Sequence, residues 1–319
     1  MQSDFSVLMG SEPKSSGHKW RGIPYAAAMV VMALGLSKTT LAQDLEPRSY
    51  ANIPIDINFL ALGYLHSDGE VAPSPGSAIE DAQLSIDSVA VGYARTFALA
   101  GSSAKFDMAV ARSCFEGSAN LNGERIEADR CGYTDPIIKL TWNFFGAPAL
   151  EAKSFANWKQ DIVIGTSLEV APPLGSYDPD RLLNAGTNRW TIRPGVGMSQ
   201  KLGRWYYNLM VSVRLYGDND EYLKSGTLSQ APQYNFQGHL IYSLGRGHWL
   251  SLNSNYFIGG ETTKNGVDSG DEQNNSRFGV TYSFPLAARH SIKLNYSTGV
   301  ITRYGNDFES FGAYWLYHF

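Results

Sequence analysis

Apolar and polar residues alternate with a period of two through most of this chain, most clearly in its last stretch, residues 308–319. From Phe311 onward every second residue is apolar, and the chain ends on Phe319. This alternation is typical of a β-strand whose two faces meet different surroundings. In a barrel that spans a membrane, the apolar column faces lipid and its aromatic rings lie at the interface. The alternative for this stretch alone is an ordinary sheet strand that happens to end the chain.

Twelve alternating stretches follow residue 43, and we find no convincing amphipathic helix between them. They lie at residues 55–65, 84–97, 103–113, 133–145, 159–170, 189–200, 204–216, 233–244, 248–258, 276–285, 289–300 and 308–319. A tilted transmembrane strand needs about 9–11 residues, and bacterial barrels usually have an even number of strands. Short and long connections alternate, except at 146–158 and 301–307. The pattern predicts an all-β transmembrane outer-membrane β-barrel of twelve antiparallel strands, with short periplasmic turns, long extracellular loops and both ends of the barrel in the periplasm.

The second column of each stretch is polar, which predicts a hydrated or hydrogen-bonded interior. Its ionisable residues are candidates for lining a pore: Lys105, Asp107, Lys139, Asp161, Glu169, Arg193, Arg214, His239, Arg277 and Lys293. A lysine or arginine that faces lipid at mid-depth costs about 2–4 kcal/mol, and the apolar columns from the fourth stretch onward carry no charge. Arg95 shares an apolar column, so we expect it at the periplasmic headgroups. Pro194 cannot donate to the ladder and predicts a local bulge.

The composition agrees with a membrane barrel. Charged residues make up 18% of the chain, below the roughly 25% usual in soluble domains, and aromatic residues make up 13%. The mean hydropathy is −0.22, and no run approaches the ~18 apolar residues of a spanning helix. An isoelectric point near 5.9 and the lack of a basic stripe argue against nucleic-acid binding. No residue spacing points to a metal ion or a cofactor.

Residues 1–42 have the order of features found in a secretory signal peptide. Basic residues precede an apolar run at 23–36, and small residues surround a cut after Ala42. An N-terminal membrane anchor is the alternative. We expect residues 43–319 to form a single barrel domain in the outer membrane of a Gram-negative bacterium.

The two cysteines of the chain, Cys114 and Cys131, both follow the signal peptide. In an exported protein such a pair is more often a disulfide than two free thiols, so we predict that they are joined. Closing this short loop contributes about 3 kcal/mol in the chain-entropy model. The terminal Phe319 resembles the assembly signal of bacterial outer-membrane barrels, which implies the barrel-assembly machinery as a partner.

Further stretches carry a resemblance to a known family. Residues 171–208 read APPLGSYDPDRLLNAGTNRWTIRPGVGMSQKLGRWYYN, followed by QYNFQGHLIY at 233–242, GGET at 259–262, NSR at 275–277 and HSIKLNYSTGVITR at 290–303. Together with YANIPIDINF at 50–59, these stretches resemble, in order and spacing, a family of outer-membrane transporters named for the meta-pathway of phenol degradation. The resemblance implies a β-barrel that passes small, aromatic or hydrophobic compounds.

The sequence leaves three functional classes open. The first is passage of small-molecule solutes through a barrel surrounded by outer-membrane lipid, unless the inward charges pair and plug the lumen. The second is an outer-membrane lipid-active hydrolase, in which His239 would activate a serine such as Ser251 or Ser212. The third is a structural or adhesive surface barrel. Residues 177–190 are rich in turn formers and either fold into the mouth or remain a solvated loop. We favour solute passage.

Overall fold

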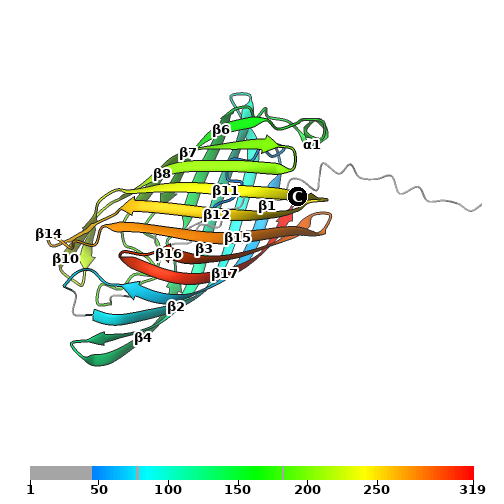
Figure 1. The fold of residues 1–319 in the computed structure, drawn as a ribbon. Coiled ribbons are helices and arrows are strands. Elements are labelled where there is room, and N and C mark those ends of the chain that lie inside the picture. Colours follow the sequence, from blue (N-terminus) through cyan, green and yellow to red (C-terminus); the bar gives the residue numbers. More distant parts are fainter. Residues whose placement is uncertain (1–44, 77–78, 182) are drawn as a thin grey trace, which may run out of the picture.

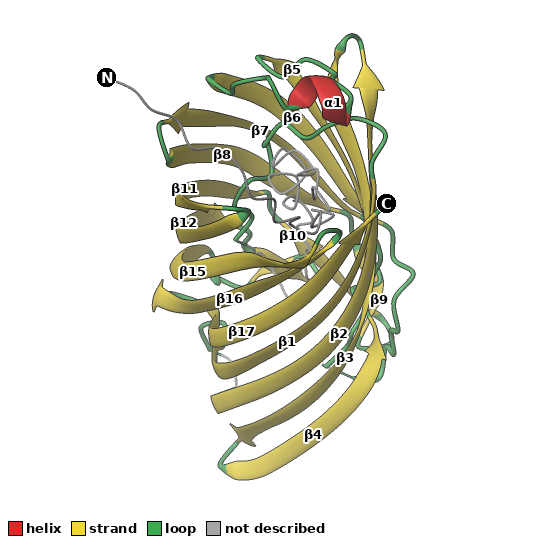
Figure 2. Cartoon of the chain, turned by 90° about the vertical axis from the view of Figure 1, so that its right-hand side faces the viewer, coloured by secondary structure: helices red, strands yellow, loops and turns green. Residues whose placement is uncertain are grey.

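The computed structural model describes residues 45–76, 79–181 and 183–319, and the predicted signal peptide lies outside these ranges. In this part of the chain, twelve strands form a closed antiparallel barrel (Figures 1 and 2). The wall strands are β1 (Asn58–Ala72), β2 (Ile79–Leu99), β3 (Ser102–Leu121), β5 (Ile137–Phe145), β6 (Ile162–Ala171), β7 (Thr191–Leu202), β8 (Trp205–Tyr216), β11 (Gln233–Gly245), β12 (His248–Gly259), β15 (Gln273–Ala287), β16 (His290–Ile301) and β17 (Gly305–His318). Strand β17 pairs with β1 from Phe59↔His318 to Ala72↔Gly305, which closes the ring. The predicted twelve-stranded barrel is confirmed.

Tight connections lie at the barrel end that carries the chain terminus. Ala100 and Gly101 join β2 to β3, and their φ angles of 50° and 79° are those that a two-residue hairpin turn requires. Arg246 and Gly247 join β11 to β12 with similar angles. The connection between β5 and β6 is longer and holds the one-turn helix α1 (Ala152–Phe155). Among the described residues, no helix has the length and apolar character to cross a membrane.

The opposite end contains more β-structure than the sequence predicts. Strand β4 (Glu124–Tyr133) pairs with the outer half of β3, so the loop expected at 114–132 is in fact a hairpin. The strand expected at 133–145 begins only at Ile137, because residues 134–136 separate β4 from β5 and include Pro136, which has no N–H to donate. Two loops contribute a small sheet of β9 (Asn219–Tyr222), β10 (Gly226–Gln230), β13 (Thr262–Lys264) and β14 (Val267–Asp268).

The two faces of the wall differ as the alternation predicts. On β8, Leu209 and Val211 are more than half exposed on the outside, whereas Asn208 and Ser212 are buried on the inside. The other wall strands repeat this arrangement, which leaves a belt of large apolar side chains around the barrel. Aromatic rings gather at the periplasmic rim, where Trp315, Tyr317 and Phe319 form a stack. Such an exterior is stable in a lipid bilayer and not in water.

The predictions for Arg95 and for Pro194 have different outcomes. Arg95 is exposed and pairs with Asn58, the first residue of β1, so it lies at the periplasmic end as expected. The bulge expected at Pro194 is wrong. The β7–β8 register is the same on both sides of this residue, and only the pairing of Arg193 and Pro194 with β8 is missing. A proline removes one donor from the ladder, and the strand accommodates that loss without an extra residue.

Candidate functional site: the barrel lumen

The lumen holds a part of the chain that comes before the first strand. Residues 45–57, here called the luminal segment, lead into β1 and lie inside the barrel. Glu46, Tyr50 and Ile53 are each at most 5% exposed. The backbone N–H of Asp56 donates to Thr96 O near the periplasmic turn of β2. The luminal segment therefore enters from the periplasmic end and fills part of the cross-section.

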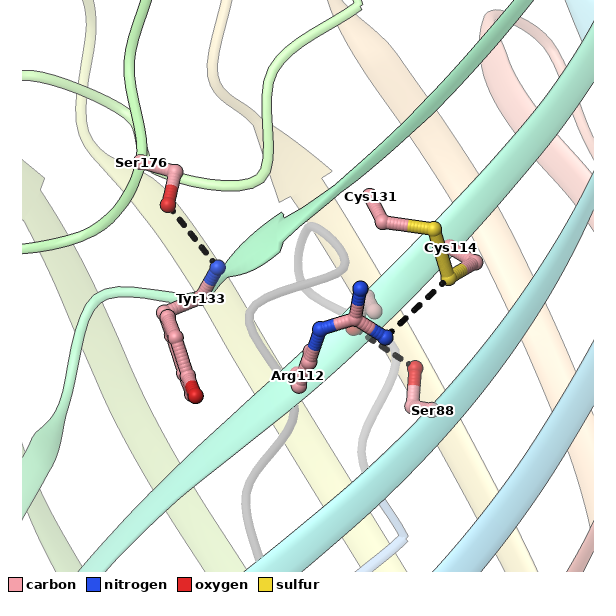
Figure 3. The surroundings of a disulfide bond; sticks show 7 residues. Ser88, Arg112, Cys114, Cys131, Tyr133 and Ser176 are labelled. Atoms are coloured by element: carbon pink, nitrogen blue, oxygen red, sulfur yellow. Dashed lines mark hydrogen bonds between the residues drawn. A yellow bond between two sulfur atoms is a disulfide. The ribbon is translucent and has the colours of Figure 1, made fainter.

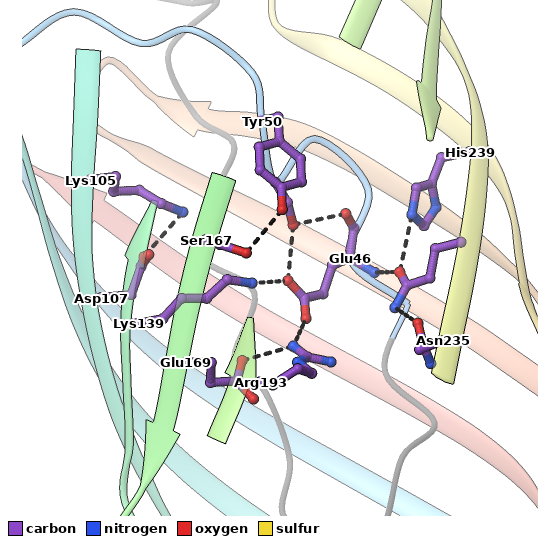
Figure 4. A network of polar contacts seen from close by, with 12 residues as sticks. Glu46, Tyr50, Lys105, Asp107, Lys139, Ser167, Glu169, Arg193, Asn235 and His239 are labelled. Atoms are coloured by element: carbon purple, nitrogen blue, oxygen red, sulfur yellow. Dashed lines mark hydrogen bonds and ion pairs between the residues drawn. The ribbon is translucent and has the colours of Figure 1, made fainter. Parts of the chain in front are cut away.

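Glu46 is at the centre of an ion cluster (Figure 4). Lys139 Nζ on β5 and Arg193 Nη2 on β7 each donate to one of its carboxylate oxygens. Arg193 Nη2 also donates to Glu169 Oε2 on β6 at 2.7 Å. All four side chains are buried, and paired charges are the form in which buried ions are tolerated. The cluster fastens the luminal segment to one side of the wall.

The strand register assembles this cluster. Asp107, Lys139, Glu169 and Arg193 are consecutive cross-strand neighbours on β3, β5, β6 and β7. They form a row of alternating charge around the inner wall, and opposite charges placed across a ladder attract each other. Lys105 Nζ lies 3.1 Å from Asp107 Oδ1 and extends the row.

Glycines make room for the luminal segment on the wall. A Cβ at Gly197 would lie 2.2 Å from Cε2 of Tyr50, and one at Gly165 would lie 2.7 Å from its Cδ1. The Tyr50 hydroxyl contacts Ser167 Oγ at 2.9 Å. On the other side, the guanidinium of Arg48 lies 4.8 Å from the ring centroid of Tyr206. The segment is thus held by ionic, hydrogen-bond and cation–π contacts.

Beyond the segment, the inner wall is polar. Buried atoms such as Thr141 Oγ1, Ser212 Oγ and Ser251 Oγ have no hydrogen-bond partner among the described residues. Buried polar groups are rarely left unpaired in folded proteins, and the usual remedy is water. The inner wall therefore carries buried polar groups whose hydrogen-bonding capacity the described side chains of the protein do not use.

His239 on β11 contacts amides in this lumen. Its Nδ1 lies 2.9 Å from Asn253 Oδ1, and its Nε2 lies 3.2 Å from Gln237 Oε1. Gln237 Oε1 also accepts the backbone N–H of Glu46, so His239 is linked to the luminal segment (Figure 4). The hydrogen bonds of this histidine join amides and not Ser251 or Ser212. A serine–histidine pair, which nucleophilic hydrolysis needs, is therefore not formed at His239 in this arrangement.

The candidate pore-lining residues are placed inside the wall with one exception. Nine of the predicted ten lie on the inner column of a wall strand: Lys105, Asp107, Lys139, Glu169, Arg193, Arg214, His239, Arg277 and Lys293. Asp161 is the exception. Strand β6 begins only at Ile162, and Asp161 is an exposed residue of the preceding connection. The alternation was extended past the true start of the strand, so its assignment to the lumen is wrong.

The loop of residues 172–181 and 183–190, here called the mouth loop, crosses the outer opening. Its Ala185 is buried against Ile86 of β2, Phe115 of β3 and Phe308 of β17, which all face inward. The mouth loop starts from β6 and ends at β7, so it reaches the opposite side of the barrel. Of the two possibilities that the sequence left open, the structure shows the one in which this loop folds into the mouth.

A buried carboxylate holds the mouth loop in place. Asp135 is 2% exposed and accepts the backbone N–H of Gly175 and of Thr187, both at 2.8 Å. At the loop surface, the N–H of Asp180 and then the guanidinium groups nearby outweigh desolvation and hold the pKa of the Asp178 carboxyl below its usual value. One of these guanidinium groups belongs to Arg130 of β4, 3.4 Å away. The loop is therefore an ordered constriction.

The predicted disulfide between Cys114 and Cys131 is confirmed. The two residues are direct cross-strand partners on β3 and β4, with their Cα atoms 4.0 Å apart (Figure 3). Two residues further along β4, Tyr133 and Ser176 exchange hydrogen bonds: Tyr133 N–H donates to Ser176 Oγ, and Ser176 N–H donates to Tyr133 O. The disulfide thus staples the hairpin to which the mouth loop is attached.

No group of three or more histidine, cysteine, aspartate or glutamate side chains is arranged to hold a metal ion within the residues that the structure describes. One acidic residue of the outer loops, Asp271, accepts hydrogen bonds from Thr262 N–H and Ser74 Oγ. These contacts fasten neighbouring loops to each other.

A closed barrel with an apolar exterior and a polar lumen defines a class: this chain is an outer-membrane β-barrel protein. More closely, it belongs to the family described as "Putative MetA-pathway of phenol degradation", which matches residues 68–317. The family resemblance predicted from the sequence is confirmed.

Solved structures share the fold. An outer membrane channel from Pseudomonas putida F1 is 19% identical, with a TM-score of 0.73 over 86% of this chain and 100% of that one. The transport unit of the autotransporter AIDA-I from Escherichia coli is 11% identical, with a TM-score of 0.54 over 93% of this chain and 98% of that one. Among the curated proteins, no sequence matches this chain. At these identities the two likenesses show the barrel fold alone.

The sequence prediction missed the luminal segment and Asp135. Residues 45–54 contain Pro47 and Pro54 and precede the first alternating stretch, so the pattern gives them no element, and residues 55–57 were assigned to the first strand, which begins only at Asn58. The burial of the luminal segment depends on partners more than 90 positions away, such as Lys139. The available signal was the group of apolar residues Tyr50, Ala51, Ile53 and Ile55 close before the first strand, which is an unusual composition for a solvated tail.

Proposed function

We propose that this barrel is a channel for small molecules in the outer membrane. The observation that carries the proposal is the lumen itself: a closed wall surrounds polar side chains, and some of their atoms have no hydrogen-bond partner among the described residues, so this interior would accept water once the luminal segment or the mouth loop moves. A hydrated path is the first requirement of a pore. The luminal segment and the mouth loop narrow this path at two levels.

The charges on the inner face support a preference for anions. The six groups Glu46, Asp107, Glu169, Lys105, Lys139 and Arg193 carry equal numbers of positive and negative charges. The remaining inward cations, Arg48, Arg214, Arg277 and Lys293, add a positive excess. Fixed charge of one sign in a narrow path favours counter-ions of the other sign.

The apolar patch at the mouth supports aromatic or hydrophobic solutes. Ile86, Phe115 and Phe308 form this patch with Val71 and Leu84 on their flank. The mouth loop covers this patch, so a solute with an apolar ring would meet a surface of matching character there once the loop has moved aside. The outer membrane channel that shares this fold supports a transport role over lipid hydrolysis. The hydrogen bonds of His239 support it too, because they are made to amides and not to a serine.

Planar-bilayer recording tests the proposal. The purified barrel should give steady single-channel currents, with a reversal potential in a KCl gradient that indicates anion preference. Liposomes that contain the protein should swell in a small solute and not in one too large for the lumen. A barrel that gave neither current nor swelling would overturn the proposal and favour a structural or adhesive role.

Two further parts of the proposal concern export and assembly. We assign residues 1–42 as the signal peptide, 43–319 as the barrel domain and Phe319 as part of the recognition signal for the barrel-assembly machinery. The stacked rings of Trp315, Tyr317 and Phe319 at the rim support the last assignment, because they leave the end of β17 exposed at the periplasmic surface.

A further inference from the structure

The barrel wall is split between β16 and β17 on its outer side. Pairing of these strands runs from His290↔Tyr317 to Ser297↔Ser310 and ends there. Both strands nevertheless continue. Strand β16 remains paired with β15 as far as Ile301, and β17 remains paired with β1 as far as Gly305. About four residues on each strand therefore have a neighbour on one side only, although both belong to the wall.

A single side chain bridges this split from the inside. Arg277 on β15 is 3% exposed. Its Nε donates to Ser297 Oγ at 2.9 Å, and its Nη2 donates to Phe308 O at 2.7 Å and to Ser310 Oγ at 2.8 Å. One guanidinium thus joins β16 to β17 at the last pair of their ladder, Ser297↔Ser310, and reaches past it to Phe308 O. A side chain can rotate away as one unit, whereas a ladder must break bond by bond.

A cavity of about 640 Å³ lies over the outside of the split. Tyr296 and Phe311, both nearly half exposed, form its lower part next to the lipid-facing belt. Its upper part is lined by the carboxylates of Asp68, Glu70, Asp307 and Glu309, all on exposed positions. Because carboxylates do not face hydrocarbon, the cavity lies where the belt meets the polar headgroups.

The inner side of the split leads to the mouth. Phe308 lies within the split and packs against Ile86 and Phe115 in the apolar patch under the mouth loop. Gly299 on the opposite strand leaves space that the Asp307 carboxylate occupies, because a Cβ at Gly299 would lie 1.9 Å from Asp307 Oδ1. Among the described residues, the side chains of Arg277, Asp307 and Phe308 lie in or across the split.

We propose that this split is a side entrance that admits ring-bearing amines from the outer membrane interface into the barrel mouth. The aromatic rings of Tyr296 and Phe311 stack favourably against the ring of such an amine and attract its ammonium group. The four carboxylates attract an ammonium group and repel an anion of the same size. Passage requires that Arg277 turn into the lumen. The proposal rests on the channel function above and adds a second entrance to the same lumen, at which cations are favoured.

Cross-linking across the split tests the side entrance. The double variant Thr298→Cys with Glu309→Cys places thiols on the two strands just beyond the last pair, and a bis-maleimide joins them. The control is Leu294→Cys with Ala313→Cys, which are direct partners in the paired region. The native cysteines form a disulfide and do not react. Proteoliposome uptake of benzylamine and of benzoate is measured before and after linking, together with KCl conductance.

We expect linking to lower benzylamine uptake several-fold in the Thr298–Glu309 variant and to leave benzoate uptake and conductance unchanged. The control should show no change for either solute. As a second test, Arg277→Lys should raise benzylamine uptake, because an ammonium on a flexible stem does not span both strands as the guanidinium does.

The outcomes separate the two proposals. Unchanged benzylamine uptake after linking, with conductance and benzoate flux present, would overturn the side entrance and leave the channel function standing. Lack of conductance and of benzoate flux in the unmodified protein would overturn the channel function. It would overturn the side entrance as well, because the side entrance leads into that channel.

Discussion

Replacing Glu46 by glutamine tests the role of the luminal segment most directly. The change keeps the shape of the side chain and removes the charge that Lys139 and Arg193 share. Glutamine retains one oxygen for one cation and turns an amide NH₂ toward the other, so at least one charge-assisted hydrogen bond is lost. The remaining wall charges then repel each other more strongly, because two cations face one carboxylate, that of Glu169.

The magnitude follows from these contacts. A hydrogen bond to a charged group contributes about 1.5–3 kcal/mol, and Glu46 makes one such bond to each cation. We estimate a loss of about 3 kcal/mol in the free energy that holds the segment in place. At about 1.4 kcal/mol for each factor of ten, the ratio of docked to released segments falls roughly 100-fold. Released segments leave a wider lumen.

Single-channel recording measures this change. Glu46→Gln should show frequent transitions to a higher conductance and a larger mean current than the unmodified protein. Asp129→Asn is the matched control, because it removes one carboxylate from the exposed surface of β4. Currents of the same size and noise in Glu46→Gln and the unmodified protein would refute the view that the luminal segment limits the path.

Three further predictions concern the wall and the loops. Cys114→Ser with Cys131→Ser should lower the stability of the outer hairpin by about 3 kcal/mol in the chain-entropy model, seen as faster proteolysis within β4 while the barrel remains resistant. Leu209→Arg places a charge on the lipid face and should cost about 2–4 kcal/mol in refolding titrations with lipid vesicles, whereas an arginine at Ser212 on the inner face should cost less. Removing Phe319 should reduce the fraction of folded barrel in outer membranes, read as heat-modifiable migration on gels.

The strands were predictable from the sequence because their signal is local. On β8, the alternation of Leu209 and Val211 with Asn208 and Ser212 specifies both the strand and its two faces. Strand β4 was missed because it lacks this local signal. Nearly all of its residues are exposed on both faces, so the burial that produces alternation is lacking.

The site depended on information that a local pattern does not contain. Alternation placed Lys139, Glu169 and Arg193 on the inner wall, and the register then made them neighbours. It gave no reason to place Glu46 among them, since the luminal segment has no period. It also misplaced Asp161, because the alternation was continued to positions before Ile162, where β6 begins.

The seam between the first and last strands determines the order in which the molecule is made. Asn58 and Phe319 exchange two backbone hydrogen bonds, each 3.0 Å long. Closure must therefore wait until the whole polypeptide has been delivered to the periplasm, since contacts between distant parts of a chain form late. Residues 45–57 directly precede this seam, so they must be enclosed as the edges come together. Until then the edges of β1 and β17 present backbone N–H and C=O groups that have no neighbouring strand, as any sheet edge does.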